Sequence, residues 1–178
     1  MKITRNRTAI AGTVALAMGC IAFAGEAHER PTVGTSPGLE MLKSLAGTWI
    51  KLDEAGKPTD EVVSVYTVTA AGSVVQEVMF PGTEHEMVTM YHQDGANLVL
   101  THYCAQGNQP HLKAVSAAER GELVFECQGG TNMASENDPH MHAVRIMFLG
   151  EDRLKSHWTQ FQGGKEDHSA TFDVARQK

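Results

Sequence analysis

The feature that most constrains this chain is a series of short segments rich in β-branched and aromatic residues, which fills the sequence after Gly47. Turn residues end each segment, and most of the separators have the composition of hairpin loops. The segments predict ten strands, at 48–53, 61–69, 73–80, 86–92, 97–104, 111–117, 121–128, 141–149, 153–162 and 168–176. Because tight turns join strands in antiparallel pairs, and because a large twisted sheet leaves unpaired edges unless it closes, we expect an all-β, ten-stranded antiparallel meander barrel.

One short helix is expected before the first strand. Ser36 can cap its first turn and Pro37 suits the first helical position, after which apolar residues recur at helical spacing. Gly47 supplies a residue that commonly ends a helix. The pattern predicts a helix over roughly 37–46, and we expect this helix to close one end of the barrel.

The N-terminus has the pattern of an export signal. Three basic residues precede an uncharged stretch over 8–24, which ends in the small-x-small sequence Ala22-Phe23-Ala24. This pattern predicts a signal peptide over 1–24, a flexible leader over 25–36 and a single barrel domain over 37–178. The chain is therefore expected to be exported to the periplasm or the extracellular space. The alternative is an N-terminal membrane anchor, for which the apolar stretch is short, and no later run of the sequence is long enough to span a membrane.

Net charge limits the expected partners. The 178 residues carry a formal charge of -6, and removal of the basic signal segment makes the remainder more negative. An acidic chain is repelled by nucleic acid and by anionic membrane surfaces, so neither is an expected partner. The sequence also lacks the nucleophile-elbow, zinc-protease and phosphate-loop motifs, and none of its motifs points to an enzyme.

Histidines and cysteines gather at one rim of the expected barrel. Side chains two residues apart share a face of a strand, and in a meander the end of each odd strand meets the start of the next even strand at one rim. We expect this rim to be the mouth, and it collects His85, His102, Cys104, His111, Cys127, His140, His142 and His168. The residues expected to line the mouth and the interior are His102, Cys104, His111, Cys127, His140, His142, Leu100, Phe125 and Phe148.

Two short segments at this rim have the spacing of metal ligands. In His140-Met141-His142 both imidazoles project from one strand in the same direction, and His102-Tyr103-Cys104 has the same geometry. Imidazole and thiolate suit zinc, copper or haem iron. The predicted metal ligands are His102, His140 and His142. Loop histidines are commonly solvated, so the alternative is that no specific metal site is present.

The sulfur-containing side chains leave two further alternatives open. Met87, Met133 and Met141 would favour Cu(I) if they converge at the mouth, whereas methionines are also common core fillers. Cys104 and Cys127 could form a disulfide in an oxidising compartment or remain free thiols. They lie two strands apart, roughly 9–10 Å if the strand 111–117 lies fully between them, which exceeds the disulfide reach of about 7 Å. A bridge therefore requires the intervening strand to start late, which the proline at its beginning permits.

A short motif adds a resemblance. Gly47-Thr48-Trp49 opens the first expected strand just after the helix, and this arrangement resembles the Gly-x-Trp signature of the calycin superfamily, the group of β-barrels that includes lipocalins, fatty-acid-binding proteins and the haem-binding nitrobindins. In such barrels a basic residue on the last strand packs over that tryptophan, and Arg176 stands at the matching position. The resemblance implies structural roles for Trp49 and Arg176. Phe80-Pro81-Gly82 and Gly107-Asn108-Gln109-Pro110 are similar to segments of uncharacterised secreted bacterial proteins with this layout.

Three functions that involve a ligand, a metal or catalysis are compatible with this layout, and the alternative to them is a structural or envelope-stress protein with a filled core and no ligand. The first, which we expect, is a secreted or periplasmic barrel that binds a small-molecule ligand at a histidine-rich mouth. The second is a metal- or haem-binding protein that uses the mouth histidines. The third is an enzyme on the same barrel, in which a mouth histidine acts as acid or base.

Overall fold

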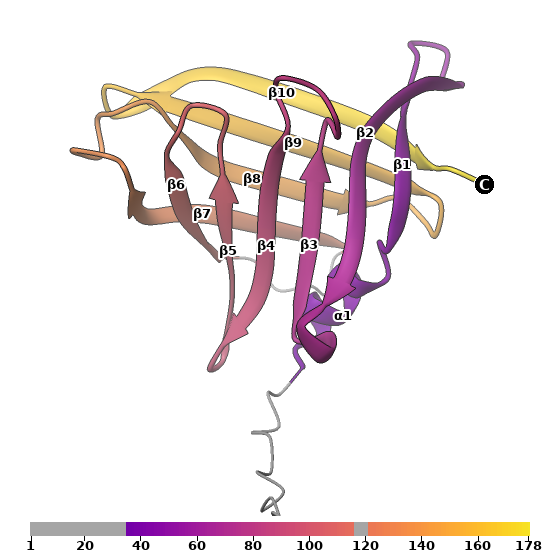
Figure 1. Ribbon diagram of the computed structural model, residues 1–178, viewed down its shortest axis with the longest axis horizontal. Coiled ribbons are helices and arrows are strands. Elements are labelled where there is room, and N and C mark those ends of the chain that lie inside the picture. Colours follow the sequence, from indigo (N-terminus) through magenta and orange to yellow (C-terminus); the bar gives the residue numbers. More distant parts are fainter. Residues whose placement is uncertain (1–34, 116–120) are drawn as a thin grey trace, which may run out of the picture. The chain divides into compact units, whose positions relative to one another are not determined.

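The computed structural model describes residues 35–115 and 121–178, whose strands form a closed antiparallel barrel (Figure 1). Each strand pairs with the next one along the chain, and the last strand closes the barrel against the first. The strands are β1 (Gly47–Leu52), β2 (Pro58–Thr69), β3 (Val74–Met79), β4 (Met87–Asp94), β5 (Asn97–Tyr103), β6 (Gln109–Ala114), β7 (Glu122–Thr131), β8 (His140–Phe148), β9 (Arg153–Gln162) and β10 (Lys165–Arg176). A short 3-10 turn, η1 (Ala70–Gly72), joins β2 to β3. The ten-stranded antiparallel meander expected from the sequence is therefore confirmed.

Several strand boundaries differ from the expected ones because pairing with a neighbour outweighs the local turn signal. β2 begins at Pro58 and β10 at Lys165, each earlier than expected, because both residues pair across a turn with the preceding strand. β7 continues to Thr131, past the expected end at residue 128, because Thr131 still pairs with Gln109 of β6. The expected signal peptide over 1–24, and parts of the expected leader and sixth strand, lie outside the described residues.

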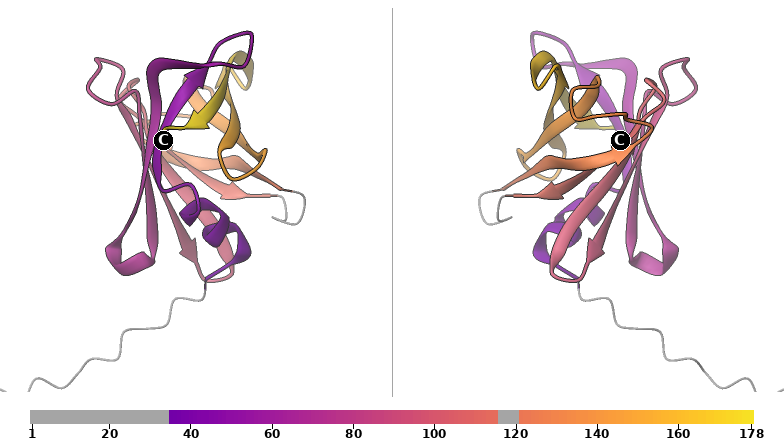
Figure 2. Two further views of the ribbon diagram at one scale, coloured as in Figure 1. Left: turned by 90° about the vertical axis from the view of Figure 1, so that its right-hand side faces the viewer. Right: turned by 90° about the vertical axis from the view of Figure 1, so that its left-hand side faces the viewer.

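The helix α1 (Pro37–Lys43) begins where the sequence indicated and ends earlier than expected. The Ser36 hydroxyl accepts a hydrogen bond from the Leu39 N–H at 3.2 Å, and Pro37 occupies the first turn. Leu39 and Leu42 are fully buried, and the helix packs against β3 and β4 near one end of the barrel (Figure 2). Within residues 35–115 and 121–178, no helix is long and apolar enough to cross a membrane.

A tryptophan and an arginine join the first and last strands. Trp49 on β1 is fully buried, and its indole N–H donates to the Leu45 carbonyl oxygen at 2.7 Å. Arg176 on β10 pairs with Trp49 across the barrel closure, and its guanidinium carbon lies 4.5 Å from the ring centroid. The same guanidinium donates to the carbonyl oxygens of Ser44 and Ala46. This pair therefore connects β1 and β10, the two strands at which the barrel closes, to residues 44–46 after α1.

The barrel interior is filled by side chains that alternate along the strands. In β3, β5 and β9 every second residue is buried over most of the strand, as expected where one face points to the core. Aromatic rings meet inside the barrel, and Tyr91 contacts Phe125 edge-on with ring centroids 5.8 Å apart. The core residues from the central strands include Val75, Tyr91, Leu100, Leu112, Leu123, Phe125, Val144 and Ile146.

A carboxyl group also lies within this core. Glu77 on β3 is 2% exposed, and its Oε1 accepts hydrogen bonds from the Ser64 and Tyr66 hydroxyls, each at 2.7 Å. The Tyr91 hydroxyl donates to Oε2, also at 2.7 Å. Burial raises the pKa of Glu77, and burial followed by the charge of Glu77 raises the pKa values of both tyrosines, so the phenols remain protonated donors. Buried and less buried residues alternate along β3, and this alternation places Glu77 on the buried face. The same period is present in the sequence, but Glu77 was not among the predicted interior residues.

Candidate metal site

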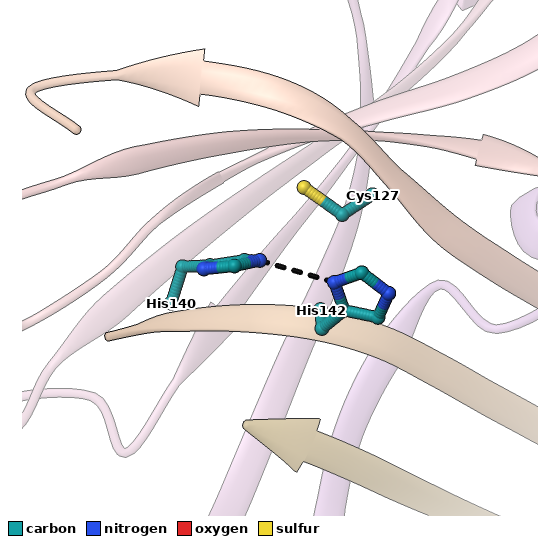
Figure 3. A group of neighbouring side chains, drawn as sticks. All are labelled: Cys127, His140 and His142. Atoms are coloured by element: carbon teal, nitrogen blue, oxygen red, sulfur yellow. Dashed lines mark hydrogen bonds between the residues drawn. The ribbon is translucent and has the colours of Figure 1, made fainter. Parts of the chain in front are cut away.

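Three metal-ligand side chains meet at the rim that contains the connections β5–β6, β7–β8 and β9–β10. Cys127 comes from β7, and His140 and His142 come from the start of β8. Their sulfur and nitrogen ligand atoms all lie within 4.8 Å of one another (Figure 3). His140 is buried and the other two are partly buried. The rim therefore presents one thiol and two imidazoles to a common point.

The pairing of β7 and β8 explains why the cysteine faces the histidines. Glu126 pairs with Ala143, which places the neighbouring Cys127 and His142 across from each other, one step closer to the rim. The register of β8 against β9 shifts between Met141 and Ala143, which marks a β-bulge. Residues two apart on a flat strand stand roughly 6.6 Å apart, and a bulge bends the strand locally. At this irregularity the two imidazoles of β8 face each other, with Nε2 of His140 and Nδ1 of His142 3.0 Å apart.

His140 is hydrogen-bonded in a way that leaves one ring nitrogen suited to a metal. Its Nδ1–H donates to the Asp138 carbonyl oxygen at 2.7 Å, since a carbonyl oxygen can only accept. In the neutral ring Nε2 therefore carries a lone pair, and it accepts a hydrogen bond from the Nδ1–H of His142 at 3.0 Å. A bond from the other ring nitrogen to a carbonyl oxygen is the contact that usually orients a metal-bound histidine.

His142 is held by ring stacking. Its imidazole lies nearly parallel to Phe161 of β9, with ring centroids 3.7 Å apart and an interplanar angle of 8°. Burial, and after it the neighbouring His140, lowers the pKa of His142. The ring is therefore neutral at physiological pH, which is the form that binds metals.

The Cys127 sulfur is held by Gly129. The thiol donates to the Gly129 carbonyl oxygen at 3.3 Å, and the Gly129 N–H donates to the sulfur at 3.4 Å. Gly129 has a φ of 120°, a conformation that favours glycine. Burial raises the pKa of the Cys127 thiol, so a metal has to displace its proton on binding. The Gly129 N–H then remains available to stabilise the thiolate.

The segment between β7 and β8 forms one wall of the site. The Asn108 amide donates to the Pro139 carbonyl oxygen at 2.7 Å, and the Gly163 N–H donates to the Asn137 carbonyl oxygen at 2.8 Å. These bonds tie the wall to both neighbouring connections at the rim. The pocket that results has a volume of about 360 Å³, and the side chains that line it beside the three ligands include Met133, Glu136 and Phe161.

His102 does not join the two predicted histidine ligands. It lies in the barrel interior, 1% exposed, where its Nδ1 shares a 2.9 Å hydrogen bond with the Thr89 hydroxyl. Its ring lies against Trp158 of β9, with ring centroids 4.7 Å apart. Alternation predicts which face of a strand a residue occupies but not its depth within the barrel. The third side chain that lies beside His140 and His142 is Cys127, and not His102.

The remaining predicted residues are dispersed. Cys104 is buried at the end of β5 and, like Cys127, is a free thiol, so the disulfide considered from the sequence is not formed. His111 is exposed, and its Nδ1 lies 3.0 Å from the Thr101 hydroxyl. Leu100 and Phe125 are fully buried core residues, and Phe148 packs against the core from a partly buried position.

The free energy of unfolding is expected to fall as the pH drops from 6.5 to about 4, because His102 is held neutral. Burial lowers the pKa of His102 from 6.5 to about 4. In this window the unfolded chain binds a proton that the folded chain does not, so the stabilisation is complete above pH 6.5 and is lost as the pH falls to about 4. The loss corresponds to about 3 kcal/mol. Urea unfolding at a series of pH values measures it.

The variant His102→Gln isolates this contribution. Glutamine keeps a neutral polar group near Thr89 and does not titrate, so the stability advantage of the wild type over the variant should shrink by about 3 kcal/mol between pH 7 and pH 4. His142, whose lowered pKa acts in the same direction, and Glu77, whose raised pKa acts in the opposite direction, are present in both proteins and cancel. The same pH dependence in both proteins would contradict the role of His102.

Comparisons of the chain with models of known protein families and with curated proteins find no match. Function is therefore inferred from the site itself. The rim presents one thiol and two imidazoles, each oriented by a hydrogen bond or by ring stacking. Such an arrangement is suited to a transition-metal ion.

Proposed function

We propose that this protein is a metal-binding β-barrel in which Cys127, His140 and His142 bind one transition-metal ion at the rim. The observation that carries the proposal is the convergence of the three ligand atoms within 4.8 Å of one another. One thiolate and two imidazoles suit zinc or copper. Because hydrogen bonds and stacking already order the side chains, metal binding has to overcome less side-chain entropy.

Small movements convert this cluster into a coordination sphere. Two metal–nitrogen bonds of about 2.0 Å at a tetrahedral angle place the nitrogens roughly 3.3 Å apart, and the facing nitrogens of His140 and His142 are 3.0 Å apart. When the proton of His142 moves from Nδ1 to Nε2, the hydrogen bond between the two rings is lost. Both facing nitrogens then carry a lone pair that can bind the metal. The Cys127 sulfur has to stand roughly 3.5 Å from each nitrogen, given a metal–sulfur bond of about 2.3 Å.

The two imidazoles cannot both bind one haem iron. A haem leaves its iron two axial positions, one on each face of the macrocycle, so two histidine ligands of one haem stand on opposite sides. Nε2 of His140 and Nδ1 of His142 are 3.0 Å apart and project from the same strand. They can occupy only neighbouring positions around one ion.

Calorimetric titration with Zn²⁺ tests the proposal. The wild-type chain is expected to show one binding site, and the double variant His140→Ala/His142→Ala is expected to show no heat of binding, because it lacks two of the three ligands. Circular dichroism and thermal unfolding establish that the double variant keeps the barrel.

A matched control removes the same number of imidazoles elsewhere. His111→Ala/His168→Ala alters two exposed histidines outside the cluster, so its binding heat should equal that of the wild type. Equal heats in the wild type and in His140→Ala/His142→Ala would contradict the metal site, and no heat in the wild type would exclude zinc as the ion that it binds.

We also propose that the barrel is of calycin type and that the chain is exported. Gly47-x-Trp49 and the contact of Trp49 with Arg176 support the first statement. The basic start of the chain and the uncharged stretch over 8–24 support the second. N-terminal sequencing of protein recovered from the periplasm or the medium tests export, with Gly25 as the expected first residue.

A small ligand inside the barrel is a second candidate function. Nε2 of His102 and Nε1 of Trp158 are buried, and neither has a hydrogen-bond partner in the part of the chain that the structure describes. Their rings are 4.7 Å apart, so one ligand hydroxyl could accept from the indole N–H and donate to the imidazole. Small alcohols should then change the tryptophan fluorescence of the wild type. The same response in His102→Gln would count against this function.

A further inference from the structure

We infer that the metal bound at this site is copper, with the thioether of Met133 as the fourth ligand beside Cys127, His140 and His142. The inference rests on the proposed metal site and deepens it by naming the ion. The observations that carry it are the position of the Met133 side chain, the surroundings of the other methionines and the softness of the resulting ligand set.

Met133 lies on the wall of the pocket that contains the three ligands. Gly130 gives its sulfur room, since a Cβ built on Gly130 would lie 2.8 Å from the Met133 sulfur and 2.7 Å from the Gln109 carbonyl oxygen. Asn132, with a φ of 56°, turns the chain between β7 and Met133, and its amide donates to the Gly107 carbonyl oxygen at 3.1 Å. The backbone of this turn therefore holds the thioether beside Gly130, on the wall of the pocket that the cluster lines.

Other methionines near the core have different surroundings. Met79 is buried within the core, and Met87 and Met141 pack against it. Of the three methionines that the sequence connected with Cu(I), Met133 is the one that lines the pocket. Met133 is partly buried and lines a pocket with a thiol, two imidazoles and a carboxylate, which is an unusual setting for a residue that only fills a core.

The chemistry of the four groups favours copper. Nitrogen and sulfur sites bind Cu²⁺ more tightly than Zn²⁺, and thiolate and thioether ligands add a preference for Cu(I). Two imidazoles and a thiolate with a weak methionine ligand form the set found in trigonal copper centres. In such centres hydrogen bonds to the sulfur adjust the properties of the metal, and the Gly129 N–H makes such a bond to Cys127 at 3.4 Å.

Glu136 offers the competing fourth ligand. Its side chain lines the same pocket. A carboxylate is a harder donor than a thioether, and together with Cys127, His140 and His142 it would complete a tetrahedral zinc site. Met133 and Glu136 therefore lead to opposite expectations for the preferred ion and for the variants that weaken its binding.

The test compares the two ions on the full chain and on Met133→Leu, with the metals themselves as probes. Cu(I), supplied anaerobically with a competing chelator, is expected to bind the wild type more tightly than Zn²⁺ does. Leucine keeps the size of the side chain and removes its sulfur, so the Cu(I) affinity should fall about tenfold or more, while the Zn²⁺ affinity changes by less than about twofold. Unfolding curves establish that Met133→Leu keeps the fold.

Glu136→Gln is the comparison variant, and its Cu(I) affinity should fall by less than that of Met133→Leu, since it removes a neighbouring charge but not a ligand of copper. With Cu²⁺ the wild type should show a visible thiolate-to-copper absorption band that Cys127→Ser lacks. Tighter binding of Zn²⁺ than of Cu(I), or a loss of Zn²⁺ affinity in Glu136→Gln with none of Cu(I) in Met133→Leu, would overturn copper and leave the metal site intact. Failure of both ions to bind the wild type would overturn the site itself.

Discussion

Trp49→Ala is expected to lower the free energy of unfolding by about 3–5 kcal/mol, the range for truncation of a large aromatic residue in a core. The indole is fully buried, and its N–H is the donor to the Leu45 carbonyl oxygen at 2.7 Å. Alanine removes that donor, leaves a cavity and takes away the ring beneath Arg176, whose guanidinium carbon lies 4.5 Å from the ring centroid. Urea unfolding of the purified chain measures the loss.

Two milder substitutions separate the contributions of this pair. Trp49→Phe keeps a buried ring but loses the indole donor, which should cost about 1–2 kcal/mol. Arg176→Lys keeps the charge but loses the planar group that stacks and donates to several carbonyl oxygens, so it should cost less than Trp49→Ala and more than an exposed substitution. A loss below about 1 kcal/mol for Trp49→Ala would contradict the role of this pair in closing the barrel.

The barrel could be predicted from the sequence because its two main signals are local. In β5 the residues Leu98, Leu100 and His102 alternate with more exposed ones, which is the period of a strand with one buried face. Hairpin turns between strands are equally local signals. The strand ends could not be predicted as well, since they depend on the partner. β7 reaches Thr131 because that residue pairs with Gln109 of β6, which lies far away in the sequence.

Part of the candidate site could be predicted for the same reason. His140 and His142 are two residues apart on one strand, so their common direction is local information. The third ligand is not local, because Cys127 faces the histidines through the register of Glu126 with Ala143 across two strands. The register shift of β8 at His142 also depends on the pairing with β9 and has no distinct signature in the residues that form it.

Glu77→Ala is the second substitution with a large expected effect, a loss of at least about 3 kcal/mol in the free energy of unfolding, because three buried hydroxyl donors lose their acceptor. The carboxyl group is 2% exposed and accepts hydrogen bonds from the hydroxyls of Ser64, Tyr66 and Tyr91, each at 2.7 Å. Alanine accepts none of them, and a buried donor without a partner costs about 1–3 kcal/mol. Denaturant unfolding at neutral pH measures the loss.

Glu77→Gln separates the hydrogen bonds from the charge. Its amide oxygen can accept from Ser64 and Tyr66 and its NH₂ can donate to the Tyr91 oxygen, so the variant should lose only about 1 kcal/mol. Because burial raises the pKa of Glu77, the contribution of this group to the stability of the wild type is complete below its unfolded-state pKa and is lost as the pH rises through its folded-state pKa. The glutamine variant lacks this dependence, so its free energy of unfolding relative to that of the wild type should increase as the pH rises. An equal loss of stability in Glu77→Gln and Glu77→Ala at every pH would mean that the amide does not replace the carboxyl group as a hydrogen-bond partner. That result would contradict the role of the hydrogen bonds to Glu77 in stabilising the barrel.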